Sequence, residues 1–342
     1  AMVEIAGGLG YQQADASFTG PGLNPWDLAA WSGGSSSGSG AAVGAGLVPF
    51  AIGSETWGSI MTPAGYCGVA GLRPTYGRVS RHGAMALSWT MDKLGPLART
   101  ADDCGTILAA VAGPDADDPT AVSREYQFPG ASPLEPPFRL ATIKGAVDGV
   151  QDEVRANYEA SLEMLRPYAT FTEIELPPLP YNTVASTLIA CEMAAAFEGL
   201  VTNEQIWEMA APEDRLGVHS SLAIPAKDYI NAQRIRRKIQ QAMDALLAPF
   251  DALVAPTLST VASPIDGSFR EYHRKWAAPT SGGAENASGI PAVSVPNGFG
   301  QRSLPTGLKF VGRAFEENRV LAVARKYQEL TDWHLRHPAG YE

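Results

Sequence analysis

The chain is poor in cysteine, histidine and basic residues, and each shortage argues against a class of protein. Its three cysteines, Cys67, Cys104 and Cys191, are odd in number and widely spaced, which argues against a disulfide framework and against a cysteine metal site. The five histidines show no HxxxH or HExxH spacing, so we expect no metal and no cofactor. With 26 Lys and Arg against 36 Asp and Glu, the net charge of −10 argues against nucleic acid as a partner.

Long apolar runs are also missing, because Gly and Pro interrupt every stretch well before the length of a bilayer span. The N-terminal residues, AMVEIAGG, lack the basic and apolar regions of a secretory signal. These absences predict a cytoplasmic protein with no membrane partner. With 45% hydrophobic and 18% charged residues in 342, the chain can bury a large core, and its 35 Gly and 26 Pro predict many loops.

The most informative stretch runs from Gly33 to Gly71 and holds two Gly/Ser segments joined by an apolar one. The first segment, Gly33–Gly40, has almost no apolar side chain to bury, so we interpret it as a loop around something polar. The apolar run Ala41–Ile52 is expected to cross the interior and to lead into a second Gly/Ser loop, Gly53–Ser59. A flexible linker would not continue in this way, so the pattern indicates chemistry.

Together with its continuation, this stretch resembles the hallmark of the amidase signature family of serine hydrolases. The segments that carry the resemblance are GGSSSGS from Gly33, GSETWGSIMTPA from Gly53, CGVAGLRPT from Cys67, GPLART from Gly95, FDALVAP from Phe250, NASGIPAVSVP from Asn286 and PTGLKFVGR from Pro305. The resemblance implies an α/β fold, with a large mixed twisted sheet flanked by helices on both faces. It also implies an amidohydrolase that cleaves amides and esters of small neutral or aromatic substrates.

The resemblance also implies roles for single residues. Ser59 matches the nucleophile that forms the acyl intermediate, and Ser35 matches a proton-relay serine that follows a cis peptide bond. The positions that match the oxyanion hole are Thr56, Trp57 and Gly58, and those that match its support are Gly34, Ser36 and Glu55. An oxyanion hole stabilises the tetrahedral intermediate only if its N–H groups are held in place before the reaction.

Two positions depart from the family pattern. Trp57 replaces a residue that is usually glycine, and Met61 replaces one that is usually arginine. An indole and a thioether at these positions would form an apolar wall of the substrate pocket. We therefore expect a preference for neutral, apolar or aromatic acyl groups.

The resemblance further implies a catalytic lysine upstream of the first Gly/Ser segment, yet no residue before Ser35 is lysine. The first lysine, Lys93, belongs to a segment that the family places away from the nucleophile. We therefore expect an N-terminally truncated chain that lacks its general base. Met2–Ala6 is predicted to be the end of a strand that began earlier, and an unpaired sheet edge would favour a homo-oligomer.

Other interpretations of the Gly/Ser stretch compete with this one. GSSSG from Gly34 matches a nucleophile elbow centred on Ser36, but no buried strand precedes it. A short-chain dehydrogenase would need a Tyr-x-x-x-Lys pair, which the chain lacks. A catalytically incompetent fragment, or a subunit that needs another segment for its base, remains open. The amidotransferase subunit of the family shares PTYGRVSR, but its GxEVKRRI segment has no counterpart here.

We predict a single domain over residues 1–342 with a loop-rich connection at about residues 113–137. Strands are expected at Phe138–Ile143, Phe250–Pro256, Asn286–Gly298 and Pro305–Arg313, and helices at Gln151–Leu165, Asp228–Leu247 and Leu321–Leu335. The second helix carries Arg234, Arg236, Arg237 and Lys238, which we interpret as a solvated face.

Overall fold

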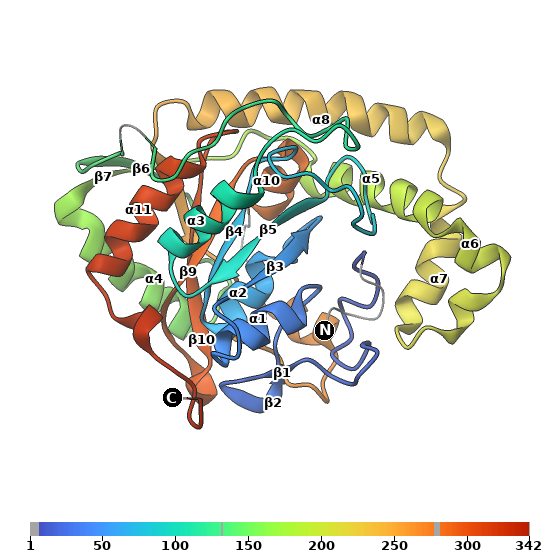
Figure 1. The fold of residues 1–342 in the computed structure, drawn as a ribbon, viewed down its shortest axis with the longest axis horizontal. Coiled ribbons are helices and arrows are strands. Elements are labelled where there is room, and N and C mark those ends of the chain that lie inside the picture. Colours follow the sequence, from blue (N-terminus) through green and yellow to red (C-terminus); the bar gives the residue numbers. More distant parts are fainter. Residues whose placement is uncertain (1–6, 131–132, 277–280, 342) are drawn as a thin grey trace.

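The computed structural model describes residues 7–130, 133–276 and 281–341, and its centre is an eight-stranded sheet (Figure 1). The strand order is β3-β5-β4-β9-β10-β8-β6-β7. The strands are β3 (Phe50–Glu55), β4 (Ala70–Arg73), β5 (Lys93–Ala98), β6 (Phe138–Ile143), β7 (Ala169–Ile174), β8 (Ala252–Pro256), β9 (Ala292–Phe299) and β10 (Pro305–Val311). The strand β6 runs parallel to β7 and β8, and the other pairs are antiparallel. The mixed sheet that the sequence predicts is thus confirmed. A separate pair, β1 (Leu23–Asn24) and β2 (Asp27–Trp31), lies outside it.

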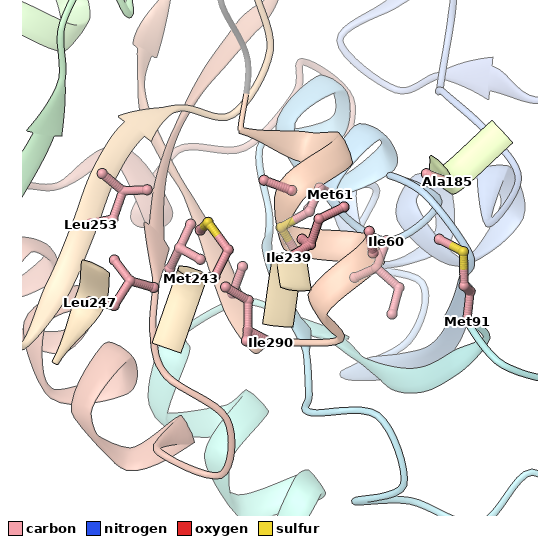
Figure 2. Packing of buried hydrophobic residues seen from close by; sticks show 14 of the residues in the cluster. Ile60, Met61, Met91, Ala185, Ile239, Met243, Leu247, Leu253 and Ile290 are labelled. Atoms are coloured by element: carbon pink, nitrogen blue, oxygen red, sulfur yellow. The ribbon is translucent and has the colours of Figure 1, made fainter. Parts of the chain in front are cut away.

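Helices cover both faces of the sheet. They are α1 (Ser37–Gly44), α2 (Met61–Cys67), α3 (Ala101–Val111), α4 (Asp152–Leu165), α5 (Tyr181–Ala196), α6 (Glu198–Thr202), α7 (Pro212–Ser221), α8 (Ala226–Leu247), α9 (Phe269–Arg274), α10 (Gly282–Ser288) and α11 (Glu317–Glu329). One apolar cluster joins the sheet to α3, α4 and α11, and another joins it to α2, α5, α8 and α10 (Figure 2). Along β8, Leu253 belongs to the second cluster while Ala252 and Val254 belong to the first, because alternate residues of a strand point to opposite faces.

The Gly/Ser stretch folds differently from the expectation. The segment Gly33–Gly40 begins as a loop, but from Ser37 it forms α1. Small residues allow this helix to lie against α2, since a Cβ atom at Gly40 would come within 2.7 Å of the Pro63 side chain. The apolar run after it does not cross the interior, because Leu47 is 71% exposed between α1 and β3. Gly53–Glu55 is the end of β3 rather than part of a loop.

Other predicted elements match to varying degrees. The strand β6 has the predicted bounds, and α4, α8 and β8 begin within two residues of them. The strand predicted to begin at Asn286 is wrong in its first part, because residues from Asn286 complete α10 and β9 begins only after that helix. The last helix, α11, begins four residues earlier and ends six residues earlier than predicted. The strand expected at Met2–Ala6 lies outside the described residues.

Two further features bear on the expectations. Arg236 is buried and donates to the carbonyl groups of Ala287 and Thr90, so the basic run of α8 is not entirely solvated. Apart from isolated bridges, residues 112–137 form no helix or strand in the part that the structure describes. In the described ranges, no helix combines the length and the apolar character needed to span a membrane.

Candidate active site

A cavity of about 530 Å³ opens where β3 ends. Residues 56–59 form one wall and lead into α2. We call them the oxyanion loop, because the resemblance predicts an oxyanion hole there. The opposite walls come from α5, from the residues after β8, and from the start of α10. The side chains that line it are largely apolar and include Tyr11, Trp57, Met61, Leu87, Ile189, Met193 and Phe269. Charged residues of the sheet and of α10 complete the lining.

The oxyanion loop presents backbone donors to this cavity. Gly58 has a φ of 90°, a conformation that glycine adopts without strain. In the described residues, no protein group accepts a hydrogen bond from the backbone N–H of Trp57, Gly58 or Ser59. All three residues line the cavity. All three residues are half-buried, so an acceptor in the cavity, from solvent or from a ligand, can reach these N–H groups.

Glu55 fixes the far end of the loop. Its Oε2 accepts from the backbone N–H of Ile60 at 2.9 Å and of Met61 at 3.0 Å, and its Oε1 accepts from Arg73 at 2.8 Å. Burial alone would raise the pKa of Glu55, but the charges of Arg73 and Lys93 and these hydrogen bonds lower it to about 2. The carboxylate is therefore ionised and holds the first turn of α2 in place.

Ser36 joins the two Gly/Ser segments. Its Oγ donates to the carbonyl of Ser54 and accepts from the Ser54 N–H, at 3.2 and 3.1 Å. Its own backbone N–H donates to the carbonyl of Ser59 at 3.3 Å. Ser36 and Glu55 thus both bind backbone groups beside the oxyanion loop, and their role as its support stays a prediction.

Ser35, the neighbour of Ser36, is 2% exposed, and the Gly34–Ser35 peptide bond is cis. A Cβ atom at Gly34 would lie 2.8 Å from the Trp31 ring, so only glycine fits there. A Cβ atom at Gly8 would lie 3.5 Å from the Ser35 Oγ. Gly8 is therefore a neighbour of this buried hydroxyl.

Trp57 and Met61 both border the cavity, and their role as a substrate pocket stays a prediction. A Cβ atom at Gly282 would lie 3.1 Å from the Trp57 Nε1, so the half-buried indole lies against the start of α10. Met61 is buried in the apolar cluster of α2, α5, α8 and α10 and also lines the cavity. Together they form an apolar wall.

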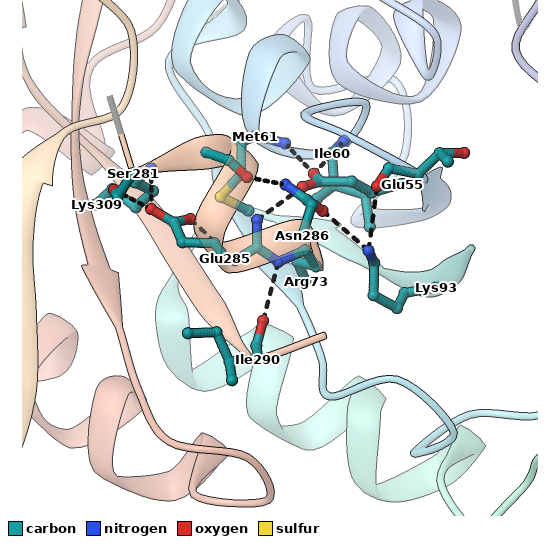
Figure 3. A network of polar contacts seen from close by, with 12 residues as sticks. Glu55, Ile60, Met61, Arg73, Lys93, Ser281, Glu285, Asn286, Ile290 and Lys309 are labelled. Carbon is teal, nitrogen blue, oxygen red and sulfur yellow. Dashed lines mark hydrogen bonds and ion pairs between the residues drawn. The ribbon is translucent and has the colours of Figure 1, made fainter. Parts of the chain in front are cut away.

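A chain of buried ion pairs lies beside the loop (Figure 3). Arg73 contacts Glu55 at 2.8 Å and Glu285 at 3.0 Å, and Lys309 contacts Glu285 at 2.7 Å. Sequence reasoning missed Arg73, Glu285 and Lys309 as parts of the site. The usable signal was a charged residue inside an otherwise apolar strand, as in PTGLKFV.

Lys93 belongs to the same cluster (Figure 3). Its Nζ donates to the carbonyl of Thr56 at 3.2 Å and to the Oδ1 of Asn286 at 2.9 Å. Burial and the nearby Arg73 lower the pKa of Lys93 to about 7, although Glu55 acts in the opposite direction. The expectation that this lysine lies away from the nucleophile loop is wrong, because the β3–β5 register sets it opposite Glu55.

Two features are absent from the described residues. In the described part of the chain, no lysine nitrogen is hydrogen-bonded to Ser35 or Ser59. The same residues contain no group of three His, Cys, Asp or Glu that could hold a metal ion. The one histidine that lines the cavity in these residues, His273, lies among aromatic rings, and burial lowers its pKa to about 4. Hydroxyl groups, backbone donors and charged side chains all line the cavity.

Comparison with known proteins agrees with this geometry. The amidase family model matches residues 8–321. Among curated relatives, a glutamyl-tRNA(Gln) amidotransferase subunit of Legionella pneumophila (strain Corby) is 34% identical, with 94% of this chain and 72% of the relative covered. The same subunit of Chromohalobacter salexigens is 36% identical, with coverage of 94% and 72%.

Solved structures show the same fold. The native peptide amidase from Stenotrophomonas maltophilia has a TM-score of 0.84 and 29% identity, over 98% of this chain and 73% of that one. The glutamyl-tRNA(Gln) amidotransferase subunit from Thermotoga maritima has a TM-score of 0.76 and 30% identity, over 91% and 68% of the two chains.

Proposed function

The chain belongs to the amidase family of amide-hydrolysing enzymes, and on this basis we propose that it cleaves small neutral or aromatic amides and esters through an acyl-Ser59 intermediate. The observation that supports the proposal is the oxyanion loop, because Trp57, Gly58 and Ser59 line the cavity and their N–H groups have no acceptor among the described residues. Donors held in this way stabilise the negative oxygen of a tetrahedral intermediate.

In the proposed reaction, Ser59 Oγ attacks the substrate carbonyl, and the C–O bond forms as the carbonyl oxygen becomes an oxyanion. The oxyanion accepts from the oxyanion loop, which Glu55 and Ser36 hold in place. The proton of Ser59 passes through Ser35 and reaches the leaving nitrogen as the C–N bond breaks. The contact between the Ser36 N–H and the Ser59 carbonyl, at 3.3 Å, supports this pairing because it sets the two serine segments side by side. Water then releases the acyl group.

The substrate class follows from the walls of the cavity. Trp57, Met61, Ile189, Met193 and Phe269 offer apolar surface, and a volume of about 530 Å³ suits a small molecule. The charged residues of the lining already pair with one another, so a charged acyl group would find few unpaired partners. This supports neutral and aromatic acyl groups.

Labelling with a fluorophosphonate tests the nucleophile. We expect one adduct, found by intact mass and placed on Ser59 by peptide mapping, and no adduct on Ser59→Ala. Ser35→Ala should lower kcat by orders of magnitude with an unchanged circular dichroism spectrum, because it removes a proton relay from a buried site. An adduct on another serine would contradict the role of Ser59, and an unchanged kcat would remove Ser35 from the mechanism.

A second candidate function comes from the curated relatives, which are subunits of a glutamyl-tRNA(Gln) amidotransferase. In that case this chain would release ammonia from an amide as a subunit that needs another segment for its base. The two candidates separate in one assay. Ammonia release from glutamine, in preference to aryl and peptide amides, would favour the amidotransferase role. The reverse preference would favour the independent amidase.

A further inference from the structure

Lys93 is a buried cation with no evident role in packing. It begins β5, directly opposite Glu55 of β3, and is 2% exposed. Burying an ammonium group is unfavourable unless its surroundings make use of it. Both of its acceptors lie at the cavity, since Thr56 and Asn286 line it.

The contact with Thr56 sets the orientation of a peptide plane. In a trans peptide, the C=O and the following N–H point in opposite directions. Lys93 Nζ binds the Thr56 carbonyl from the β5 side at 3.2 Å. The N–H of the same peptide belongs to Trp57 and is therefore turned away from Lys93. This N–H has no acceptor in the described residues, and Trp57 lines the cavity.

The segment before β5 holds Thr56 at a second point. Thr56 Oγ1 donates to Asp92 at 2.5 Å, and Asp92 in turn accepts from the backbone N–H groups of Leu87 and Ser88. Two consecutive residues, Asp92 and Lys93, thus bind the side chain and the carbonyl of Thr56. Thr56, which precedes the Trp57 N–H, therefore has little freedom to rotate.

Asn286 extends the restraint to the opposite wall. It accepts from Lys93 at 2.9 Å, and its Nδ2 donates to the carbonyl of Gly282 at 3.0 Å. Gly282 lies against the indole of Trp57. Lys93 therefore connects the oxyanion loop with α10, the two elements between which a substrate carbonyl would lie.

We propose that Lys93 is a positioning residue that aims the Trp57 N–H at the oxyanion by holding the Thr56 carbonyl. The proposal rests on the function proposed above. It does not depend on the charge of Lys93, because a neutral amine still has two N–H groups for its two acceptors. The charged groups around Lys93 are Glu55, Arg73, Asp92 and Arg236.

The test compares an oxyanion mimic with a substrate. Phenylboronic acid forms a tetrahedral adduct with a serine nucleophile, and 4-nitroacetanilide reports kcat and KM. For Lys93→Met we expect kcat and the affinity for the boronate to fall together by roughly tenfold or more, with KM within about twofold. A residue that binds only the transition state has this signature.

Arg78→Met is the matched control, because it removes a buried cation that pairs with Glu317 and does not line the cavity. In this variant the ratio of boronate affinity to KM should stay at the wild-type value. Fluorophosphonate titration counts the active sites in each sample, so loss of folded protein is not mistaken for loss of catalysis.

If Lys93→Met does not fold, Lys93→Gln replaces it. Its amide nitrogen ends one bond short of the Nζ position and cannot reach both acceptors, so a smaller loss of boronate affinity is expected. An unchanged boronate affinity in either variant, or an equal loss in Arg78→Met, would overturn the proposal. Failure of the wild type to bind boronate and fluorophosphonate at Ser59 would instead refute the proposed function.

Discussion

Two buried arginines on either side of Pro74 and Thr75 share the same chemistry and differ in what surrounds them. Arg73 and Arg78 are each 1% exposed, and each pairs with a glutamate that is 0% exposed. Arg73 joins Glu55 to Glu285 and borders the cavity. Arg78 pairs with Glu317 at the first turn of α11, and it is absent from the cavity wall.

The difference shows two uses of a buried ion pair. The glutamate bound by Arg73 also accepts from Ile60 and Met61, so its charge holds the backbone of the oxyanion loop. The glutamate bound by Arg78 accepts from the N–H of Thr75, and Arg78 itself donates to main-chain carbonyls and stacks on aromatic rings. The first cluster maintains a site, and the second fastens α11 to the turn after β4. A buried ion pair often contributes little net stability. The two clusters therefore differ mainly in the parts of the chain that they hold together.

Arg73→Met should have the largest effect, because it leaves two buried carboxylates without their shared partner. We expect a loss of roughly 3–5 kcal/mol in the free energy of unfolding. Fluorophosphonate labelling of Ser59 should also fall in the protein that remains folded. Urea unfolding and a labelling time course measure the two effects. Normal labelling of a destabilised variant would mean that the cluster serves only packing.

Arg78→Met tests the other half of the comparison. Here one buried carboxylate loses its partner and keeps the Thr75 N–H, so we expect a loss near 3 kcal/mol, the lower end of that range. The labelling rate of the folded fraction should equal that of the wild type. A slower rate would show that the turn after β4 transmits strain to the oxyanion loop.

Acid should weaken the first cluster through Glu55. Its pKa in the fold is about 2, below the ordinary 4.5, so its contribution to stability is complete above 4.5 and is lost as the pH falls towards 2. Between pH 4.5 and pH 3 this amounts to about 1.5 kcal/mol. Denaturant unfolding at both pH values should show a shallower loss in Glu55→Gln. Equal losses in the variant and the wild type would contradict a lowered pKa.

Tyr126→Phe should have the smallest effect. The Tyr126 hydroxyl is buried near Arg78, and no group in the described residues forms a hydrogen bond with it. Removing a buried hydroxyl without a partner should be neutral or should stabilise the protein by up to about 1 kcal/mol. A melting temperature that does not fall would agree. A clear loss of stability would reveal a partner for this hydroxyl.

The sequence predicts the local features of the site better than its long-range ones. The resemblance carried by the Gly/Ser stretch pointed to Ser36, Glu55 and the oxyanion loop, and their roles stay predictions. The helix α1 was missed because glycine and serine favour loops, and only close packing against Pro63 shows why small residues suit a helix here.

The sequence did not predict the contacts between distant segments. Arg73 and Glu285 are 212 positions apart and meet only because β4 lies beside β9, with α10 just before it. The contact of Lys93 with Thr56 depends on the register of β3 and β5. Hydrophobic patterns indicate which residues form strands, but they do not determine which strands pair.

Because β3 lies at the edge of the sheet, the serines of the first Gly/Ser segment can bind its free backbone groups. On the side away from β5, Ser36 Oγ both donates to and accepts from the backbone of Ser54, and Ser39 Oγ donates to the carbonyl of Ile52. These hydroxyls occupy backbone groups that a neighbouring strand would otherwise bind. An open edge can recruit the same strand of another molecule and start a growing assembly. The serine segment therefore leaves fewer backbone groups of β3 open to a strand of another molecule.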